Sequence, residues 1–584
     1  MKLKNIKLGL IALIIVFSAC QEDILDRYPL DAISSLDYWK TAGDARLFSN
    51  QFYPQVFSVS GSDRYEDLFA EDIDSDDMVF VSAYPRFRGS RVVPATGGWD
   101  YSRIRSLNYF LENYRNIESS FDEYKSYVGE VYFFRAYTYF ELVKEYGDVP
   151  WIGKTLNIDS EELYLPKTPR NTVVDSIIAD LDIAIDLLPD AIIDGRTRLN
   201  KAIAQLFKSR VCLYEGTWEK YQSGSAFGVS DPNPEKYLNM VVQSAGDIIQ
   251  SGAYSIHNTG NPDWDYFMFG AVDQSQNPEV LLWKKFDRNL GMTHSVQYQL
   301  ANGNSGGMGL SKNFVESYLC TDGNPIAQAD GSPNPLYLGD GDLATVFKNR
   351  DLRAKQTIFE PGDIIRINPG SDTLKFVMAA VDKPAHTKNT TGYQIEKGLN
   401  WDAVHSDLGK LDGGTTGKIL MRYAEVLLNF AEAKAELGNL TQADIDNTIN
   451  KLRDRVGMPH LMINSIQTDP NWQFPTLSPV LNEIRRERRV ELIGEGFRWD
   501  DIARWAAADE LVVGKRYLGA KFNNIDFPDF TEDDFKLKDG YFDELRDQIP
   551  EGNGFVIGRD YLSPISTEEL NLNKSLVQNP GWQQ

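Results

Sequence analysis

Histidine and cysteine are scarce in this chain, with five histidines and three cysteines among 584 residues. No two histidines are spaced as H-x-x-x-H, which excludes the helix of a metalloprotease. The absence of any C-x-x-C pattern excludes a cysteine-based zinc site. Cys212 lies in a helical pattern (KSRVCLYE), where a free thiol is commonly a small buried hydrophobe, so we expect Cys212 and Cys320 to remain unpaired. We expect surface or polar-core positions, and not ligand roles, for His257, His294, His386, His405 and His460.

Positive charge is also in deficit. The chain has 60 Lys and Arg residues against 84 Asp and Glu residues, and its formal net charge is −24. A surface this acidic repels phosphate groups, which argues against nucleic acid as a partner. The same repulsion disfavours peripheral binding to anionic lipid.

Long apolar runs are absent apart from one, which extends from Leu8 to Phe17. Ten apolar residues are too few to span a bilayer as a helix. Three lysines precede the run and small residues follow it, and this order is typical of a secretory signal peptide, here residues 1–19.

The end of this segment resembles a bacterial lipobox. Ser18-Ala19-Cys20 supplies the small residues and the cysteine, and Phe17 replaces the usual leucine. The resemblance implies that Cys20 is diacylated and becomes the new N-terminus, and several acyl chains on one residue hold a protein on a membrane almost permanently. The segment Gln21-Glu22-Asp23, with acidic residues just after the cysteine, resembles the surface-export signal of Bacteroidota lipoproteins. The alternative is a plain signal peptide with an incidental cysteine.

Helical periodicity dominates the rest of the chain, because apolar residues recur at steps of three and four. Two irregular tracts, 253–417 and 506–584, are the exceptions, and the first contains short β-type runs such as EVLLWKKF and TLKFVMAA. We predict a mainly α fold in which tetratricopeptide-like helix pairs, about 100–252 and 419–505, pack with an irregular, loop-rich region in one body, 20–584. Helices are predicted at 101–116, 121–146, 172–189, 200–216, 235–251, 419–437, 441–456 and 478–493.

Four segments, in order along the chain, resemble the SusD-like (RagB/SusD) family. They are FFRAYTYFELVKEYGDVPWI (133–152), LMRYAEVLLNFAEAKAELGN (420–439) with INKLRDRVGMP (449–459), IRRERRVELIGEGFRWDDIARW (484–505) and YLSPISTEELNLNKSLVQNPGW (561–582). The resemblance implies four helix pairs beside an irregular ligand-binding region. It also implies an outer-membrane lipoprotein that binds an oligosaccharide or polysaccharide at the cell surface without catalysis, and that delivers it to a SusC-like TonB-dependent transporter.

Three further patterns have structural explanations. The G-x-S-x-G pattern at 303–307 lies in a glycine-rich loop and lacks the strand and helix that a nucleophile elbow requires. The basic run 485–489 is interleaved with acids at helical spacing, Glu483 with Arg486 and Arg488 with Glu491, which predicts a salt-bridged helix. The acidic run 71–77 does not fit an EF-hand; a solvated loop, an irregular calcium site and hydrogen bonding to a sugar all remain open. No cofactor is otherwise expected.

Aromatic residues are plentiful, with 28 Tyr, 30 Phe and 11 Trp, and those in loops can stack on the apolar face of a sugar ring. Acids and arginines can then bond to the hydroxyl rim. For each aromatic residue core packing is the alternative, above all for Trp283, which lies in an apolar run. In the family, the loop before the first long helix and a later loop of the irregular tract contact glycan, so the expected sites are Asp76, Asp77, Arg86, Phe87, Arg88 and Trp99, followed by Trp264, Tyr266, Tyr298 and Trp401.

Two other functions compete with glycan capture. A surface glycoside hydrolase would use paired carboxylates, but these are too common in an acidic chain to be diagnostic. A helical-repeat scaffold would bind only protein. The sequence does not identify the sugar.

Overall fold

The structure is a computed structural model that describes residues 38–57, 72–370, 372–406 and 413–582. Helices dominate these ranges, as predicted. The longer helices are α5 (Ser102–Asn113), α6 (Phe121–Tyr146), α7 (Arg170–Leu187), α8 (Lys201–Tyr221), α9 (Pro234–Ser251), α13 (Tyr423–Glu436) and α16 (Pro479–Glu491). The shorter ones are α3 (Ala42–Asn50), α4 (Phe52–Val56), α10 (Val296–Ala301), α11 (Lys312–Val315), α12 (Leu343–Phe347), α14 (Gln442–Asn447), α15 (Ile449–Arg455), α17 (Arg498–Arg504), α18 (Ala508–Leu511) and α19 (Thr567–Leu572).

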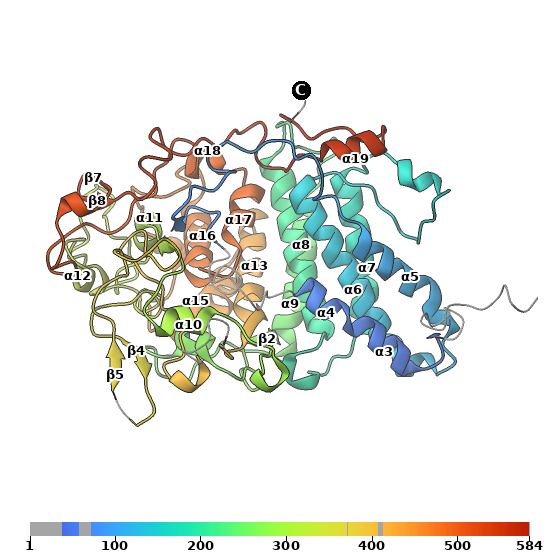
Figure 1. The fold of residues 1–584 in the computed structure, drawn as a ribbon, viewed down its shortest axis with the longest axis horizontal. Coiled ribbons are helices and arrows are strands. Elements are labelled where there is room, and N and C mark those ends of the chain that lie inside the picture. Colours follow the sequence, from blue (N-terminus) through green and yellow to red (C-terminus); the bar gives the residue numbers. More distant parts are fainter. Residues whose placement is uncertain (1–37, 58–71, 371, 407–412, 583–584) are drawn as a thin grey trace, which may run out of the picture.

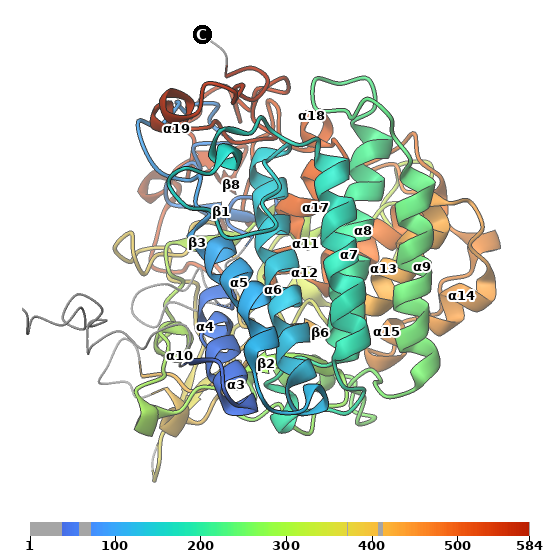
Figure 2. The same ribbon diagram turned by 90° about the vertical axis from the view of Figure 1, so that its right-hand side faces the viewer.

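The longer helices stand side by side in one half of the molecule, and loops with short helices such as α10, α11 and α12 fill the other half (Figures 1 and 2). Along the helical half, α5, α6, α7, α8 and α9 pack in sequence order. Helix α13 packs against α9 and α16, and α17 packs against α8. Helices that come before and after the irregular tract therefore share one layer. None of the described helices is both long enough and apolar enough to cross a membrane.

Most helix ends follow local rules. Helix α6 begins with a capping box between Ser120 and Glu123 and ends at Gly147, whose φ of 72° is easy for glycine and costly for other residues. The predicted capping box of Thr441 and Asp444 is present at the start of α14, and the Ser478 side chain caps α16 as predicted.

Two helix predictions are wrong in part. Residues 418–422 form strand β6 (Lys418–Arg422) and not the first turn of a helix, because they pair with β2 (Val280–Lys284), about 140 positions earlier in the chain. The helix predicted for 441–456 is divided into α14 and α15 at Thr448, whose ψ is −88° and whose hydroxyl donates to the Asp444 carbonyl at 2.6 Å.

Within the described ranges, the strands form four antiparallel pairs. Besides β2 with β6, these are β1 (Met78–Phe80) with β3 (Met308–Leu310), β4 (Ile364–Ile367) with β5 (Thr373–Lys375), and β7 (Leu537–Lys538) with β8 (Tyr541–Phe542). The β1–β3 pair joins the 72–101 segment to the irregular tract. It therefore fixes the position of a segment in which the sequence predicts binding residues.

Helix α16 is charged and yet buried. Arg485 pairs with Glu436 at 3.1 Å, and Arg486 lies 3.5 Å from Glu483, as the helical spacing predicts. Arg488 pairs with Asp501 at 2.8 Å instead of the expected Glu491. The salt-bridged helix is confirmed, but most of its partners come from other parts of the chain, among them α13, α17 and the 72–77 segment.

Three smaller predictions are confirmed. Cys212 and Cys320 are buried free thiols. Trp283 is buried, and its Nε1 donates to the Gly195 carbonyl at 2.8 Å. Ser305 of the G-x-S-x-G pattern lies in a turn between α10 and β3, where its hydroxyl donates to the Met308 carbonyl at 2.6 Å, so the pattern is not a nucleophile elbow.

Candidate functional site

The acidic side chains expected to bind a ligand are buried. Asp76 accepts from Arg498 Nε at 2.6 Å and from Arg489 Nη2 at 3.1 Å, and Asp77 accepts from Arg489 Nε at 2.6 Å. Burial alone would raise the pKa of Asp76, but the two arginines outweigh it and lower the pKa to about 2. These carboxylates hold helices α16 and α17 against the 72–77 segment, so the expectation that they contact a surface ligand is wrong.

Asp72 strengthens the same junction. Its carboxylate accepts the backbone N–H groups of Gly494 at 2.7 Å and Arg498 at 3.0 Å. The segment 492–497, which connects α16 to α17, is therefore held by Asp72, which bonds to Gly494 within it and to Arg498 directly after it. Glu71 and Cys20 lie outside the described residues, as does the whole of 1–19.

Two other expected binding residues belong to the interior. Phe87 is buried, with its ring centroid 5.9 Å from that of Trp499. Tyr266 is fully buried, and its hydroxyl donates to the Glu491 carbonyl at 2.6 Å. Both expectations are wrong, because a ring enclosed by packed side chains fills core space and cannot also present a face to a sugar in solution.

The remaining candidates lie near the surface. Arg88 is exposed, and Tyr298 is half-buried in α10. Trp99 is half-buried, with its ring edge-on to Tyr146 at a centroid distance of 5.0 Å, and it lines a groove of about 570 Å³ against α5 and α19. Trp99 therefore lies beside the cavity described next and not inside it.

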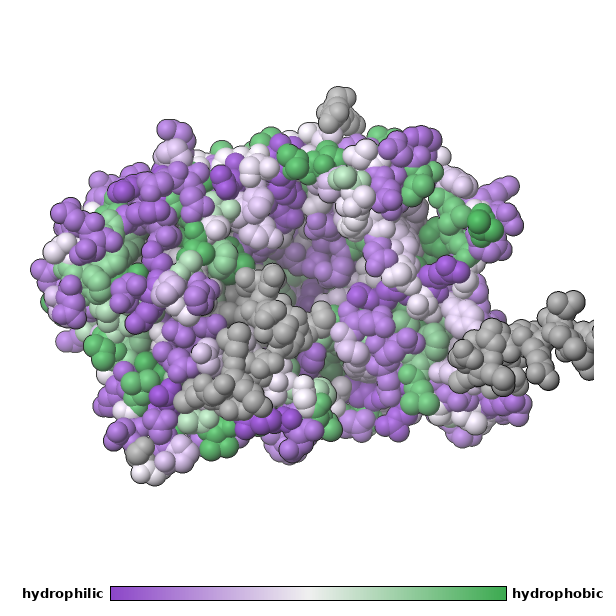
Figure 3. All heavy atoms as spheres, in the orientation of Figure 1, coloured by the Kyte–Doolittle hydropathy of each residue, from purple (hydrophilic) through white to green (hydrophobic). Residues whose placement is uncertain are grey.

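A polar cavity of about 520 Å³ opens between α6, the 74–103 segment and α17. A second chamber of about 240 Å³ adjoins it, because Glu141, Lys144 and Asp500 line both. We call the two together the central cleft. A hollow with hydrophilic walls opens on the face of the molecule drawn in Figure 3. The larger chamber is also lined by Asp74, Tyr84, Arg86, Asp100, Arg103, Glu145, Tyr146 and Trp499.

Arg86 is the most distinctive residue of the larger chamber. Its guanidinium carbon lies 4.3 Å from the centroid of the Trp499 ring. Only 8% of the residue is exposed, and its Nε has no hydrogen-bond partner. Among the described residues its nearest opposite charge is Glu145, 3.7 Å away, which exceeds hydrogen-bond distance. A buried donor without a partner costs free energy, so this guanidinium is prepared to bond to a ligand acceptor.

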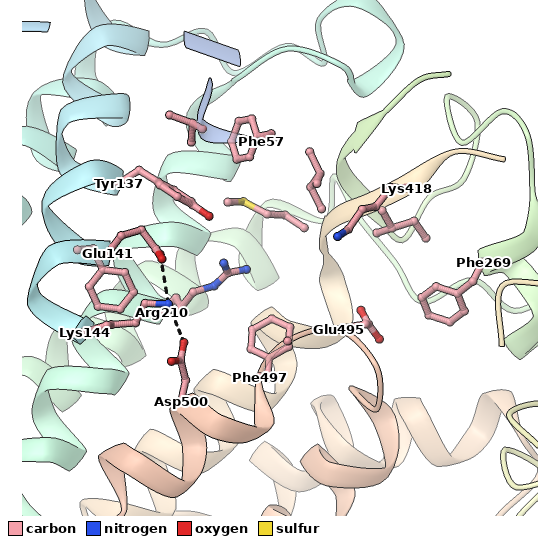
Figure 4. Close-up of a pocket in the computed structure, with 16 residues that line it drawn as sticks. Phe57, Tyr137, Glu141, Lys144, Arg210, Phe269, Lys418, Glu495, Phe497 and Asp500 are labelled. Atoms are coloured by element: carbon pink, nitrogen blue, oxygen red, sulfur yellow. Dashed lines mark hydrogen bonds and ion pairs between the residues drawn. The ribbon is translucent and has the colours of Figure 1, made fainter. Parts of the chain in front are cut away.

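Carboxylates and a lysine form the floor of the cleft. Lys144 lies 2.9 Å from Asp500 and 3.2 Å from Glu141, as Figure 4 shows. Burial raises the pKa of Asp74 to about 6, although Arg86 works in the opposite direction. Donors and acceptors thus alternate around the cavity, and this pattern suits a ligand rich in hydroxyl groups.

The smaller chamber adds aromatic walls. Phe57, Tyr137, Phe140 and Phe497 line it (Figure 4). Arg210, also in the wall, is held by a bidentate pair with Glu425, with both N–O distances 2.7 Å.

A separate pocket of about 290 Å³ brings together two of the expected residues, Trp264 and Trp401. Their ring centroids are 5.0 Å apart, although 137 positions separate them in the chain. Trp499, Phe267 and Glu396 were not among the predicted site residues. Trp499 lies inside the segment 484–505, which served only as evidence of the family resemblance, and its neighbour Asp500 also lines the cleft.

Two protein-family models match the chain. The model of the SusD family matches residues 278–582, and a second model, described as starch-binding associating with outer membrane, matches residues 96–213. SusD-like protein P2 of Formosa agariphila is 23% identical over 99% of this chain and 100% of its own length.

Solved structures share the fold. A SusD-like protein from Bacteroides fragilis superposes with a TM-score of 0.69 at 22% identity, covering 95% of this chain and 100% of its own. A second protein of that species, named as a SusD-like carbohydrate binding protein, gives a TM-score of 0.69 at 21% identity, covering 92% of this chain and 100% of its own.

Proposed function

Because the chain belongs to the SusD family, we propose that it is a carbohydrate-binding protein of the outer membrane, which holds a glycan in the central cleft without cleaving it. The observation that carries the choice of site is Arg86, a nearly buried guanidinium with an unpartnered Nε, stacked on Trp499 at the wall of the cavity. Tyr84, which is 39% exposed, offers a second aromatic surface at the same wall.

The cleft suits reversible capture. Aromatic rings cover the apolar face of a sugar, while Arg86, Arg103, Asp74 and Asp100 can bond to its hydroxyl rim. A protein that passes its ligand on requires only moderate affinity, about 4–8 kcal/mol for millimolar to micromolar binding.

A glycan array probed with the purified protein tests this function. We expect binding to a restricted set of neutral glycans. Starch is one glycan to include, because the second matching family is described as starch-binding. Signal from no glycan would contradict the proposal.

Glycoside hydrolysis is a second candidate, and one observation favours it. The pKa of Asp74 is raised to about 6 in a cleft that contains other carboxylates, and a general acid of a glycosidase requires a raised pKa. Reducing-sugar release from the glycans that bind distinguishes the two functions. We expect no release above background; steady release that is lost in Asp74→Asn would establish the enzyme.

We further propose that Cys20 is acylated and anchors the protein at the outer surface of the outer membrane. Labelled palmitate should enter the wild-type protein and not Cys20→Ala, because the proposed lipobox leaves a single acylation position. The control is Cys212→Ala, which removes a buried thiol and should label as the wild type does. Equal labelling of Cys20→Ala and wild type would contradict the anchor.

The partner is proposed to be a SusC-like TonB-dependent transporter, to which the protein delivers the glycan. This proposal rests on the family and on no residue pattern in the chain. Gentle solubilisation of outer membranes should co-purify a large TonB-dependent barrel with the protein, and recovery of the protein alone would count against the partnership.

A further inference from the structure

Three aromatic side chains form a cluster at the surface of the irregular tract. The Trp264 centroid is 5.3 Å from that of Phe267 and 5.0 Å from that of Trp401, and Phe267 and Trp401 are 5.1 Å apart. Trp264 is 50% exposed, although an indole of this size usually buries more of its surface. The three rings line the 290 Å³ pocket, near the lower end of the range for small-molecule sites.

The loop that carries Trp264 is held rigidly. Asp265 is buried at the start of the 3₁₀ helix Asp265–Gly270, and it accepts from the Thr259 hydroxyl at 2.6 Å and from the Asn261 N–H at 3.2 Å. The carbonyl of Trp401 accepts the Ile367 N–H at 2.7 Å, which ties the second tryptophan to β4. A pocket with fixed walls loses little conformational entropy when a ligand binds.

Glu396 gives this pocket a buried carboxyl group. The residue is only 2% exposed and lines the pocket, and its Oε2 has no hydrogen-bond partner among the described residues. Burial raises the pKa of Glu396 well above its usual range and nearby Asp363 adds to the rise, while a hydrogen bond from Trp401 works in the opposite direction. The rise favours a protonated carboxyl, which can donate to one hydroxyl and accept from another.

We propose that this pocket is a second carbohydrate-binding site, in which an uncharged sugar ring stacks on Trp264 and bonds through a hydroxyl to Glu396. It shares no lining residue with the central cleft. The choice of a sugar as its ligand rests on the proposed function, but occupancy of the pocket does not depend on that of the cleft.

The charges around the pocket select among sugars. Asp263 and Asp363 line the cavity, and Lys355 is the only basic residue among its lining residues; Glu396, when protonated, adds no charge. A uronic acid or a sulfated sugar would place its anion among these acids, and like charges at short range repel. Neutral pyranosides and furanosides are therefore the expected ligands.

Saturation-transfer NMR with a panel of methyl glycosides tests the site. The probes are neutral hexosides and pentosides together with methyl glucuronide. The background is a protein whose cleft is disabled by Trp499→Leu and Arg86→Lys, so that residual binding reports the pocket alone. We expect neutral glycosides to bind this protein and methyl glucuronide not to bind it.

Trp264→Ala, made in the cleft-disabled protein, tests whether the residual binding occurs in this pocket. Loss of one stacked ring should weaken it by about tenfold or more. Trp264→Phe should retain most of it, because a flat ring remains. Tyr164→Ala is the matched control, since Tyr164 is an exposed aromatic residue on the 3₁₀ helix Glu161–Tyr164 and lines neither cavity. Circular dichroism of each variant should match the parent protein, since both residues are at least half exposed.

The outcomes separate the two proposals. Neutral-glycoside binding to the cleft-disabled protein that Trp264→Ala abolishes supports the second site. Two outcomes would overturn the second site without contradicting the cleft. In the first, Trp264→Ala leaves the binding of the cleft-disabled protein unchanged. In the second, the cleft-disabled protein does not bind although the wild type does. A third outcome would overturn the cleft as the main site: the cleft-disabled protein binds as tightly as the wild type, and adding Trp264→Ala removes that binding.

Discussion

Glu491→Gln is expected to destabilise the fold by about 3–5 kcal/mol, because it removes a buried carboxylate that three buried arginines share. Each arginine keeps a second carboxylate, Glu279 for Arg422 and Arg455 and Asp351 for Arg353, but the buried network loses one of its negative charges. The Glu491 carboxylate is fully buried and accepts from three arginines: from Arg422 at 2.6 Å, from Arg455 at 2.6 Å and from Arg353 at 2.9 Å. Glutamine has nearly the same shape, but its amide would direct N–H groups at those donors.

The pH of the measurement matters. Burial alone would raise the pKa of Glu491, but Arg455, Arg422 and Arg353 outweigh it and hold the pKa well below its usual range. A lowered folded-state pKa contributes stability above the unfolded value of about 4.3, and this contribution is lost as the pH falls toward the folded pKa. The full effect is therefore present at neutral pH.

Guanidinium unfolding at pH 7 measures the effect. Glu161→Gln is the control, because Glu161 is exposed and such substitutions usually change stability by no more than about 0.5 kcal/mol. An unfolding midpoint for Glu491→Gln equal to that of the control would contradict the account of the network.

Trp499→Leu is expected to weaken glycan binding by about tenfold or more, which is the effect of losing one stacked aromatic ring. Leucine keeps apolar volume beside Phe87 and Phe555, whose centroids lie 5.9 Å and 6.0 Å from that of Trp499. The fold should therefore survive while the flat face in the cleft and the surface beneath Arg86 are lost.

Arg86→Lys provides an independent test of the same wall. Lysine keeps the charge but lacks the planar guanidinium that stacks on an indole and bonds through several N–H groups. Calorimetric titration with the glycan selected on the array should show a comparable loss for both variants. Unchanged affinity in both variants, with folding intact, would remove this wall from the site.

The parts of the fold that local sequence determines were predicted well. Residues 121–146 form a helix at the expected bounds because a capping box and a glycine mark its ends. Residues 419–422 were predicted to be helical because their pairing with β2 cannot be seen in any local sequence pattern. The same limit applies to the break at Thr448, where the backbone leaves the helical conformation within a sequence whose pattern is continuously helical.

The site was harder to predict, because long-range partners decide its chemistry. Asp76 and Asp77 have the composition of a ligand-binding loop, but Arg489 and Arg498, more than 400 residues later, occupy their oxygens. Trp264 and Trp401 were each expected in a site, and only the fold brings them into one pocket. Glu396 gave no signal, since an unpartnered buried oxygen is a property of the fold and not of the sequence.

Isothermal titration calorimetry of the purified protein with the glycan that the array selects tests the central claim most directly. We expect saturable heat with a dissociation constant between about 1 mM and 1 μM. The same glycan should be recovered intact from the calorimeter's sample cell after the titration. Absence of heat with every glycan tested, or recovery of shortened sugar, would contradict the account of a protein that captures carbohydrate without cleaving it.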